Sequence, residues 1–250
     1  MASGQLVRND DPVPLSGRTM VVTGGARGIG AAVVRMARGR GARVAVLDVQ
    51  AAPGDLEVDC YAGCDVSRAY DVRDAFAAVR RTLGPVDTLV NNAGVAPPGG
   101  FDDLTEEAWN RTLAINLTGV FLCTRQALPE LRASGRGSVT NMGSIAGRHR
   151  SFTASAAYAA AKGGVIAFTR QLAHELAADA VRVNCVCPGL VDTEIIRHNV
   201  PESERAALAR AVPLGRLATV EEVAAVTCFL ASEAASYLTG AVIDVNGGLY

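Results

Sequence analysis

From Leu15 onward, short apolar runs rich in Val, Ile and Thr alternate with longer stretches whose apolar residues recur at helical spacing. Gly, Pro and Asn separate the two kinds of segment, which is typical of repeated strand–helix–strand units. The short runs predict seven strands: Thr19–Thr23, Arg43–Leu47, Tyr61–Cys64, Thr88–Val90, Ser138–Asn141, Arg182–Val186 and Val242–Val245. The longer stretches predict helices at Gly28–Arg38, Arg68–Leu83, Glu106–Leu131, Ala156–Ala178, Glu202–Arg210 and Glu221–Ala231. This pattern predicts an α/β fold with one doubly wound, seven-stranded parallel sheet and helices on both faces.

Two intervals depart from this regular alternation. The stretch 49–60 contains Pro53 and Gly54 and is too short for a full helix, so we expect a loop or a single turn there. The segment 190–215 is longer than an ordinary connector and follows the carboxyl end of a strand, the edge at which open parallel sheets bind ligands. We therefore expect a substrate lid at 190–215, within a single domain spanning 15–250 that follows a flexible tail at 1–14.

Composition narrows the class of protein. The chain has 250 residues, of which 49% are hydrophobic but only 5% aromatic, as expected for a core of Ala, Val, Leu and Ile. Its formal net charge of -1 lacks the positive excess typical of proteins that bind nucleic acid or anionic membranes. No uncharged apolar run approaches the roughly 18 to 20 residues that span a bilayer, and the first residues lack the apolar core of a secretion signal. We therefore expect a cytoplasmic protein without nucleic-acid or membrane partners.

The six cysteines and three histidines do not follow the spacing of a zinc or redox motif. We predict no metal site and interpret the cysteines as small buried core residues. Cys185 and Cys187 lie two apart in a predicted strand, so their side chains should point to the same side of the sheet without forming a disulfide.

A glycine-rich turn, Thr23-Gly-Gly-Ala-Arg-Gly-Ile-Gly30, joins the first predicted strand to the first predicted helix. Glycines in such a turn let the backbone approach a pyrophosphate, whose charge is held by N–H groups at the helix N-terminus. The order strand, turn, helix thus predicts nucleotide binding. The expected contacts are Gly24, Arg27, Gly28, Ile29 and Gly30.

Asp48 follows at the carboxyl tip of the second predicted strand, with Val49 next to it. A carboxylate at this position accepts hydrogen bonds from the ribose hydroxyls of NAD and repels the 2′-phosphate of NADP. NAD is therefore favoured over NADP. Two observations keep alternatives open: Asp48 could be a solvated residue at a strand end, and Arg27 could pair with a 2′-phosphate.

Four motifs follow one another along the chain: TGGARGIG from Thr23, NNAG at Asn91–Gly94, Ser144, and Tyr158-Ala-Ala-Ala-Lys162. In this order they resemble the short-chain dehydrogenase/reductase family, and the resemblance extends over about residues 15–250. It implies a Rossmann-type fold and an oxidoreductase that acts on CH–OH donors with NAD or NADP as acceptor. It also implies self-association as a homotetramer or a dimer.

The catalytic prediction centres on Tyr158 and Lys162, which lie four residues apart and so on one face of a predicted helix. A nearby ammonium is expected to lower the pKa of the Tyr158 phenol toward the range useful for acid–base catalysis. The hydroxyl of Ser144 can hold the substrate oxygen. The resemblance implies that Lys162 also binds the nicotinamide ribose and that the backbone of Asn116 binds a water in a proton relay. Alternatively, Asn116 caps a kink in a long helix.

The same resemblance implies further cofactor contacts at positions that match the family's motifs. Asp65 and Val66 match the adenine pocket, and the others match the cofactor wall and the nicotinamide side: Asn92, Ala93, Gly94, Pro188, Gly189, Val191 and Thr193.

The substrate contacts are less well defined by the sequence. Ser144 precedes Tyr158 by 14 residues, where the family more often shows 13, so the intervening loop is unusual. Its Arg148 and Arg150 could meet an anionic or polyhydroxylated substrate, or they could belong to a solvated basic turn. Besides these two arginines, the candidate substrate contacts are Ser144, Ile145 and Leu190.

These observations predict hydride transfer between a nicotinamide cofactor and a small-molecule secondary alcohol or ketone, with tyrosine as general acid–base. Two alternatives remain open. One is an NADPH-dependent 3-oxoacyl-[acyl-carrier-protein] reductase, and the other is a nucleotide-binding scaffold without catalysis.

Overall fold

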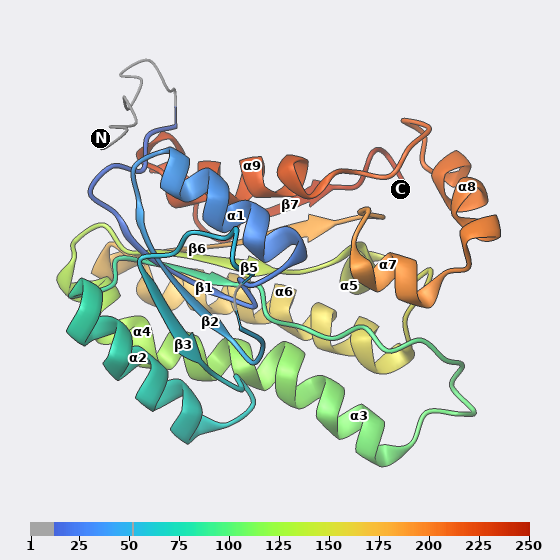
Figure 1. The fold of residues 1–250 in the computed structure, drawn as a ribbon, viewed down its shortest axis with the longest axis horizontal. Helices are drawn as coiled ribbons and strands as arrows, with labels where there is room; N and C mark the ends of the chain where they lie inside the picture. Colours follow the sequence, from blue (N-terminus) through green and yellow to red (C-terminus); the bar gives the residue numbers. More distant parts are fainter. Residues whose placement is uncertain (1–12, 52) are drawn as a thin grey trace.

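A computed structural model describes residues 13–51 and 53–250, and within them it contains one seven-stranded sheet (Figure 1). All strands are parallel, in the order β3-β2-β1-β4-β5-β6-β7. This confirms the predicted doubly wound fold, in which the order reverses between β1 and β4. The predicted tail at 1–14 falls almost entirely outside the described residues.

The strands lie within a few residues of their predicted positions: β1 Thr19–Thr23, β2 Arg43–Asp48, β3 Cys60–Gly63, β4 Thr88–Asn91, β5 Ser138–Met142, β6 Arg182–Pro188 and β7 Val242–Val245. Register aligns their carboxyl ends: Thr23 pairs with Asn91, and Asn91 pairs with Asn141. The loops that follow β1, β4 and β5 therefore leave the sheet at one common edge.

Two layers of helices cover the sheet. Helices α1 (Gly28–Gly39) and α9 (Val220–Ala231) pack on one face, against side chains such as Val22 and Val44. Helices α2 (Ala69–Leu83), α4 (Gly119–Ala133) and α6 (Ala156–Leu176) pack on the other, against Val21 and Ala45 (Figure 1). Neighbouring strand residues point to opposite faces, and apolar side chains on both faces make the strands continuously hydrophobic.

The predicted helix Glu106–Leu131 is wrong in one respect, because it is interrupted. Helix α3 (Glu106–Leu113) passes into a π-helical turn at Ala114–Thr118 before α4 begins. The Asn116 side chain donates a hydrogen bond to the Thr112 carbonyl at 3.0 Å and another to the Val95 carbonyl at 2.9 Å. The π-helical turn holds one residue more than an α-helical turn, and the bond to Val95 connects it to the loop after β4.

The described part of 49–60 contains no helix, as predicted. The segment 190–215 carries two short helices, α7 (Glu194–Asn199) and α8 (Glu202–Ala211). Short helix α5 (Ile145–Arg148) and short 3₁₀ turns at Ala177–Asp179 and Glu233–Ala235 complete the fold. None of the helices in the described residues is long and apolar enough to cross a membrane.

Candidate active site

A cavity of about 950 Å³ opens at the carboxyl edge of the sheet, where the predicted site residues converge. Most of those predicted from the sequence line it: Gly24, Arg27, Gly28, Ile29, Asp48, Val49, Asp65, Val66, Asn92, Ala93, Gly94, Asn116, Ser144, Ile145, Tyr158, Lys162, Pro188, Gly189, Leu190, Val191 and Thr193. Gly30, Arg148 and Arg150 do not. The sheet register explains this convergence, because each of these loops leaves the sheet at the same edge.

The glycine-rich turn packs closely on the loop after β4, and at Gly24 and Gly30 a side chain would not fit. Gly24 has φ +62°, and a Cβ there would lie 2.7 Å from the Cα of Ala93. A Cβ on Gly30 would lie 2.1 Å from the Gly24 carbonyl oxygen. Asn92 holds the turn in place, since its Nδ2 donates to the Gly24 carbonyl at 2.8 Å and to the Thr23 carbonyl at 3.1 Å. Gly30 thus has a packing role behind the cavity wall.

Helix α1 begins at Gly28 beside the cavity, and its N-cap residue Arg27 makes no side-chain capping hydrogen bond. The first N–H groups of a helix need acceptors and favour negative charge. The tight turn and this helix N-terminus together fit the pyrophosphate of a dinucleotide.

Asp48 stands at the end of β2 with its carboxylate already oriented. One oxygen, Oδ2, accepts from the Ala26 N–H at 3.0 Å, and Oδ1 accepts from the Gln50 N–H at 3.0 Å. Tyr61 of β3, which the sequence analysis missed, donates its hydroxyl to the carbonyls of Asp48 (3.0 Å) and Gln50 (2.5 Å). These bonds hold the carboxylate at the cavity wall.

Ser144, Tyr158 and Lys162 meet across the cavity from Asp48. Ser144 caps α5, and its Oγ accepts from the Ala146 N–H at 3.1 Å. Tyr158 and Lys162 lie one turn apart in the first part of α6, as predicted. The Lys162 Nζ lies 5.7 Å from the centre of the Tyr158 ring and donates to the Met142 carbonyl at 2.7 Å.

The electrostatics of this trio differ from the sequence prediction. Burial raises the pKa of Tyr158 above its ordinary value, and a hydrogen bond with Ser144 acts in the opposite direction. The expectation that Lys162 lowers this pKa is thus corrected, because burial outweighs the stabilising contacts. Burial also acts on the ammonium, lowering the pKa of Lys162 to about 8.

Asn116 supports both the cavity and the loop after β4. Its Oδ1 accepts from the Val95 N–H at 3.3 Å, and a Cβ on Gly94 would come within 2.6 Å of the same oxygen. Side chain and π-helical turn thus form one local structure. Of the two sequence interpretations, the helix irregularity is observed here, and π-turns are frequent at functional sites.

Comparison with known proteins agrees with this geometry. A family model described as enoyl-(acyl carrier protein) reductase matches residues 24–250. The chain is also 39% identical to an uncharacterized short-chain type dehydrogenase/reductase from Sinorhizobium fredii, over 94% of this chain and 98% of the relative. The chain belongs to the short-chain dehydrogenase/reductase family. This membership confirms the predicted class of enzyme, an oxidoreductase of CH–OH or keto groups.

Two further proteins are similar to this chain over nearly their whole length. Cis-4-hydroxycyclohexanecarboxylate dehydrogenase from Sinomonas cyclohexanicum is 40% identical, with 92% of this chain and 96% of the relative covered. The ligand-free structure of an aldohexose dehydrogenase from Thermoplasma acidophilum superposes with a TM-score of 0.88 at 29% identity and covers 94% of each chain.

On the substrate side, the candidate residues Arg148 and Arg150 do not line the cavity. Arg148 points to the C-terminal region, where its guanidinium forms an ion pair with Asp244 at 3.0 Å. Its Nε also donates a hydrogen bond to the Tyr250 hydroxyl at 3.2 Å. The guanidinium of Arg150 lies 4.5 Å from the centre of the Phe152 ring. Each arginine is therefore engaged by another side chain.

Further residues line the substrate side of the cavity and carry no motif of their own: Pro97, Pro98, Ser151, Phe152, Thr153, Ala154, Ile195, Ile196, His198 and Asn199. The last four lie within the segment 190–215, where the sequence predicts a lid. The others lie in the turn after β4 and the loop before α6, and the sequence could indicate these segments but not the individual contacts.

The six cysteines are free and buried, as the sequence analysis expected. The Sγ atoms of Cys185 and Cys187 lie 3.9 Å apart on one side of β6. Within residues 13–51 and 53–250, no group of three His, Cys, Asp or Glu side chains is arranged to hold a metal ion.

Proposed function

We propose that this protein is an NAD-dependent dehydrogenase of a secondary alcohol, or a reductase of the corresponding ketone, with Tyr158 as the general acid–base. One observation carries the proposal: a single cavity extends from Asp48 to Ser144, Tyr158 and Lys162. It thus combines a dinucleotide cradle with a proton-transfer group.

The residues of the cavity fit a nicotinamide cofactor. The N-terminus of α1 would hold the pyrophosphate, and Asp48 would accept hydrogen bonds from the adenosine ribose. Asp65 and Val66 border the adenine. On the opposite side, Lys162 would bind the second ribose, and Val191 and Thr193 would contact the nicotinamide carboxamide. The other cofactor contacts that line the cavity are Asn92, Ala93, Gly94, Pro188 and Gly189. When bound, the cofactor supplies hydride exchange with the carbon that carries the substrate oxygen.

Proton transfer then falls to this chain's own side chains. The Ser144 hydroxyl holds the substrate oxygen, and the Tyr158 hydroxyl gives or takes the proton at that atom. Because burial raises the pKa of Tyr158, the phenol is protonated at neutral pH, which is the form that donates to a ketone. Lys162 and the backbone of Asn116 extend the path for the proton, as in the family. Segment 190–215 acts as the substrate lid.

Two charged side chains support NAD over NADP as the cofactor. The Asp48 carboxylate would repel a 2′-phosphate. Arg27, the cation that could offset this repulsion, pairs instead with Glu194 of α7 at 3.1 Å. Initial rates with NAD and NADP, measured side by side at equal concentrations, test this assignment. Equal or faster turnover with NADP would contradict it.

A relative from Vibrio cholerae named 3-oxoacyl-[acyl-carrier-protein] reductase, 35% identical over 94% of this chain, supports one alternative, an NADPH-dependent enzyme of that class. Such an enzyme would reduce an acyl-carrier-protein thioester with NADPH faster than it oxidises small secondary alcohols with NAD. One assay with both substrates and both cofactors therefore separates the two functions.

The proton-transfer role is tested with Tyr158→Phe, which removes only the hydroxyl. We expect loss of turnover on a panel of secondary alcohols, sugars, hydroxy acids and hydroxysteroids, with NADH binding retained in a fluorescence titration. Tyr70→Phe is the matched control, because Tyr70 is exposed on α2. If Tyr158→Phe keeps most of the activity, the mechanism is wrong. A wild-type protein that binds NADH but turns over no substrate would favour the silent scaffold.

We also propose that the protein forms a homotetramer or a dimer in the cytoplasm. The Ala-rich α6 and the apolar C-terminal segment 241–250 are the surfaces that led to this expectation. Sedimentation equilibrium as a monomer would contradict the assembly.

A further inference from the structure

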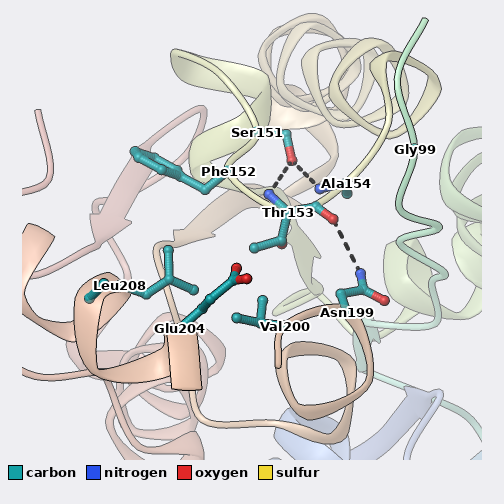
Figure 2. Close-up of a pocket in the computed structure, with 10 residues that line it drawn as sticks. Gly99, Ser151, Phe152, Thr153, Ala154, Asn199, Val200, Glu204 and Leu208 are labelled. Atoms are coloured by element: carbon teal, nitrogen blue, oxygen red, sulfur yellow. Dashed lines mark hydrogen bonds between the residues drawn. The ribbon is translucent and has the colours of Figure 1, made fainter. Parts of the chain in front are cut away.

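A second cavity, of about 540 Å³, adjoins the first on the substrate side (Figure 2). It lies between the loop 151–154, the end of α7 and one side of α8. The two cavities share five lining residues: Ser151, Phe152, Thr153, Ala154 and Asn199. We refer to it as the outer cavity, since it continues away from Tyr158.

Hydrogen bonds fix the residues that border both cavities. Asn199 Nδ2 donates to the Ala96 carbonyl at 2.8 Å and to the Thr153 carbonyl at 3.4 Å. Ser151 Oγ accepts from the Ala154 N–H at 2.8 Å, which closes the loop on itself (Figure 2). The segment 190–215 and two loops are thereby joined at one point. The outer cavity is therefore a formed part of this side of the site.

The lining of the outer cavity combines polar groups with apolar side chains, and it carries one charge on the exposed residue Glu204. Phe152, Val200, Ala207 and Leu208 contribute apolar surface, and Glu204 is the only residue of the lining with a formal charge. Glu204 projects from α8 toward Thr153 (Figure 2). A cation, Arg150, directly precedes the loop 151–154, and its guanidinium stacks on the Phe152 ring.

We propose that the outer cavity is the subsite for the distal part of the substrate and takes an apolar group that ends in an ammonium. The side chains of Phe152, Val200 and Leu208 contact the body of such a group, and the Glu204 carboxylate pairs with its charge. A distal carboxylate or phosphate would meet the like charge of Glu204. The inference rests on the proposed dehydrogenase function and specifies its substrate class.

A homologous series of alkan-2-ols tests the proposal, with each chain length prepared in three forms that end in methyl, ammonium or carboxylate. At the chain length that reaches α8, we expect the ammonium form to have the highest kcat/KM. Glu204→Gln should lower the ammonium-to-methyl ratio of kcat/KM by about fivefold, the effect of an ion pair of about 1 kcal/mol. Glu202→Gln is the matched control, because Glu202 is exposed on the same helix and does not line the outer cavity.

Three results would overturn the proposal: an unchanged ratio in Glu204→Gln, an equal fall in Glu202→Gln, or a preference for the carboxylate form that Arg150→Ala removes. The first and third leave the dehydrogenase function standing, because the methyl forms are still oxidised. If no alcohol is oxidised, NMR saturation transfer from the NADH-loaded protein to an alkylammonium still tests the subsite. We expect that signal to weaken in Glu204→Gln and to persist in Glu202→Gln, and equal signals in both would refute the subsite.

Discussion

Lys162 is the only lysine in the sequence, and its ammonium is buried at the wall of the active-site cavity. Its side chain is held by one hydrogen bond, from Nζ to the Met142 carbonyl. Burial lowers the pKa of Lys162 from 10.5 to about 8, and the nearby Cys185 and Cys187 act in the opposite direction. We predict that this single group makes the free energy of unfolding depend on pH.

The sign and size of the effect follow from the two pKa values. Below about pH 8, Lys162 is protonated in both states, and the folded protein carries the full penalty of a buried ammonium. Between about 8 and 10.5 the unfolded chain binds more protons, so stability rises with pH. The shift corresponds to about 3 kcal/mol at about 1.4 kcal/mol per pKa unit. Lys162→Met lacks the titrating group, so its stability relative to the wild type should fall by about this amount across the window.

The assay is urea unfolding of the wild type and Lys162→Met at about pH 6.5 and about pH 10. Loss of the hydrogen bond to Met142 adds an offset that does not vary with pH, so the change in the difference between the proteins is the diagnostic quantity. Lys162→Arg is the control that stays protonated throughout and should gain no stability by deprotonation.

The pKa itself can be measured directly, because protein labelled with ¹³Cε-lysine gives one lysine resonance. We expect its titration midpoint near pH 8. A midpoint at the ordinary value of a lysine, or a difference between the wild type and Lys162→Met that is the same at both pH values, would refute the reasoning.

Three further predictions concern the cofactor and the proton. Gly30→Ala should weaken NADH binding at least tenfold in a fluorescence titration and lower Tm, because the added Cβ would overlap the Gly24 carbonyl. The control Gly39→Ala, at the open end of the same helix, should change neither quantity. Ser144→Ala removes the hydrogen bond that lowers the pKa of Tyr158, so besides slowing turnover it should move the alkaline limb of the reduction pH profile upward; an unshifted limb would argue against this coupling. Glu194→Gln frees the arginine of the turn and should lower KM for NADP severalfold while KM for NAD changes less; an unchanged ratio of the two would show that the ion pair does not affect cofactor choice.

The position of the residues that we propose for the cofactor could be predicted from the sequence because its determinants are local. A strand, a glycine turn and a helix follow one another within residues 19–39, and only backbone geometry is needed to convert them into an anion cradle. The position of Asp48 was predictable for a similar reason, because the carboxyl ends of all strands in a parallel sheet lie at the same edge. Tyr61 was not, because its role comes from pairing of β2 with β3.

The π-helical turn and the raised pKa of Tyr158 are two features that the residue spacing along the sequence does not predict. One extra residue in a helix leaves the apolar spacing of Glu106–Leu131 almost unchanged, so the sequence predicts one continuous helix there. The pKa of Tyr158 depends on how deeply α6 buries it, and a motif that contains Tyr158 and Lys162 holds no information on burial. Spacing thus predicts which groups meet, while tertiary packing determines how strongly each is desolvated.

The substrate half depends on contacts between segments far apart in the chain, and Arg148 shows the consequence. From the sequence it was a candidate for the substrate, yet its partners Asp244 and Tyr250 come from β7 and the end of the chain. Tyr250 also donates to Asp244 at 2.7 Å, so the three side chains form a closed cluster. Since Arg148 ends the short helix that Ser144 caps, this cluster links the C-terminus to the residue that we propose holds the substrate oxygen. The partners of Arg148 thus come from the far end of the chain, and no local pattern around it could have indicated them.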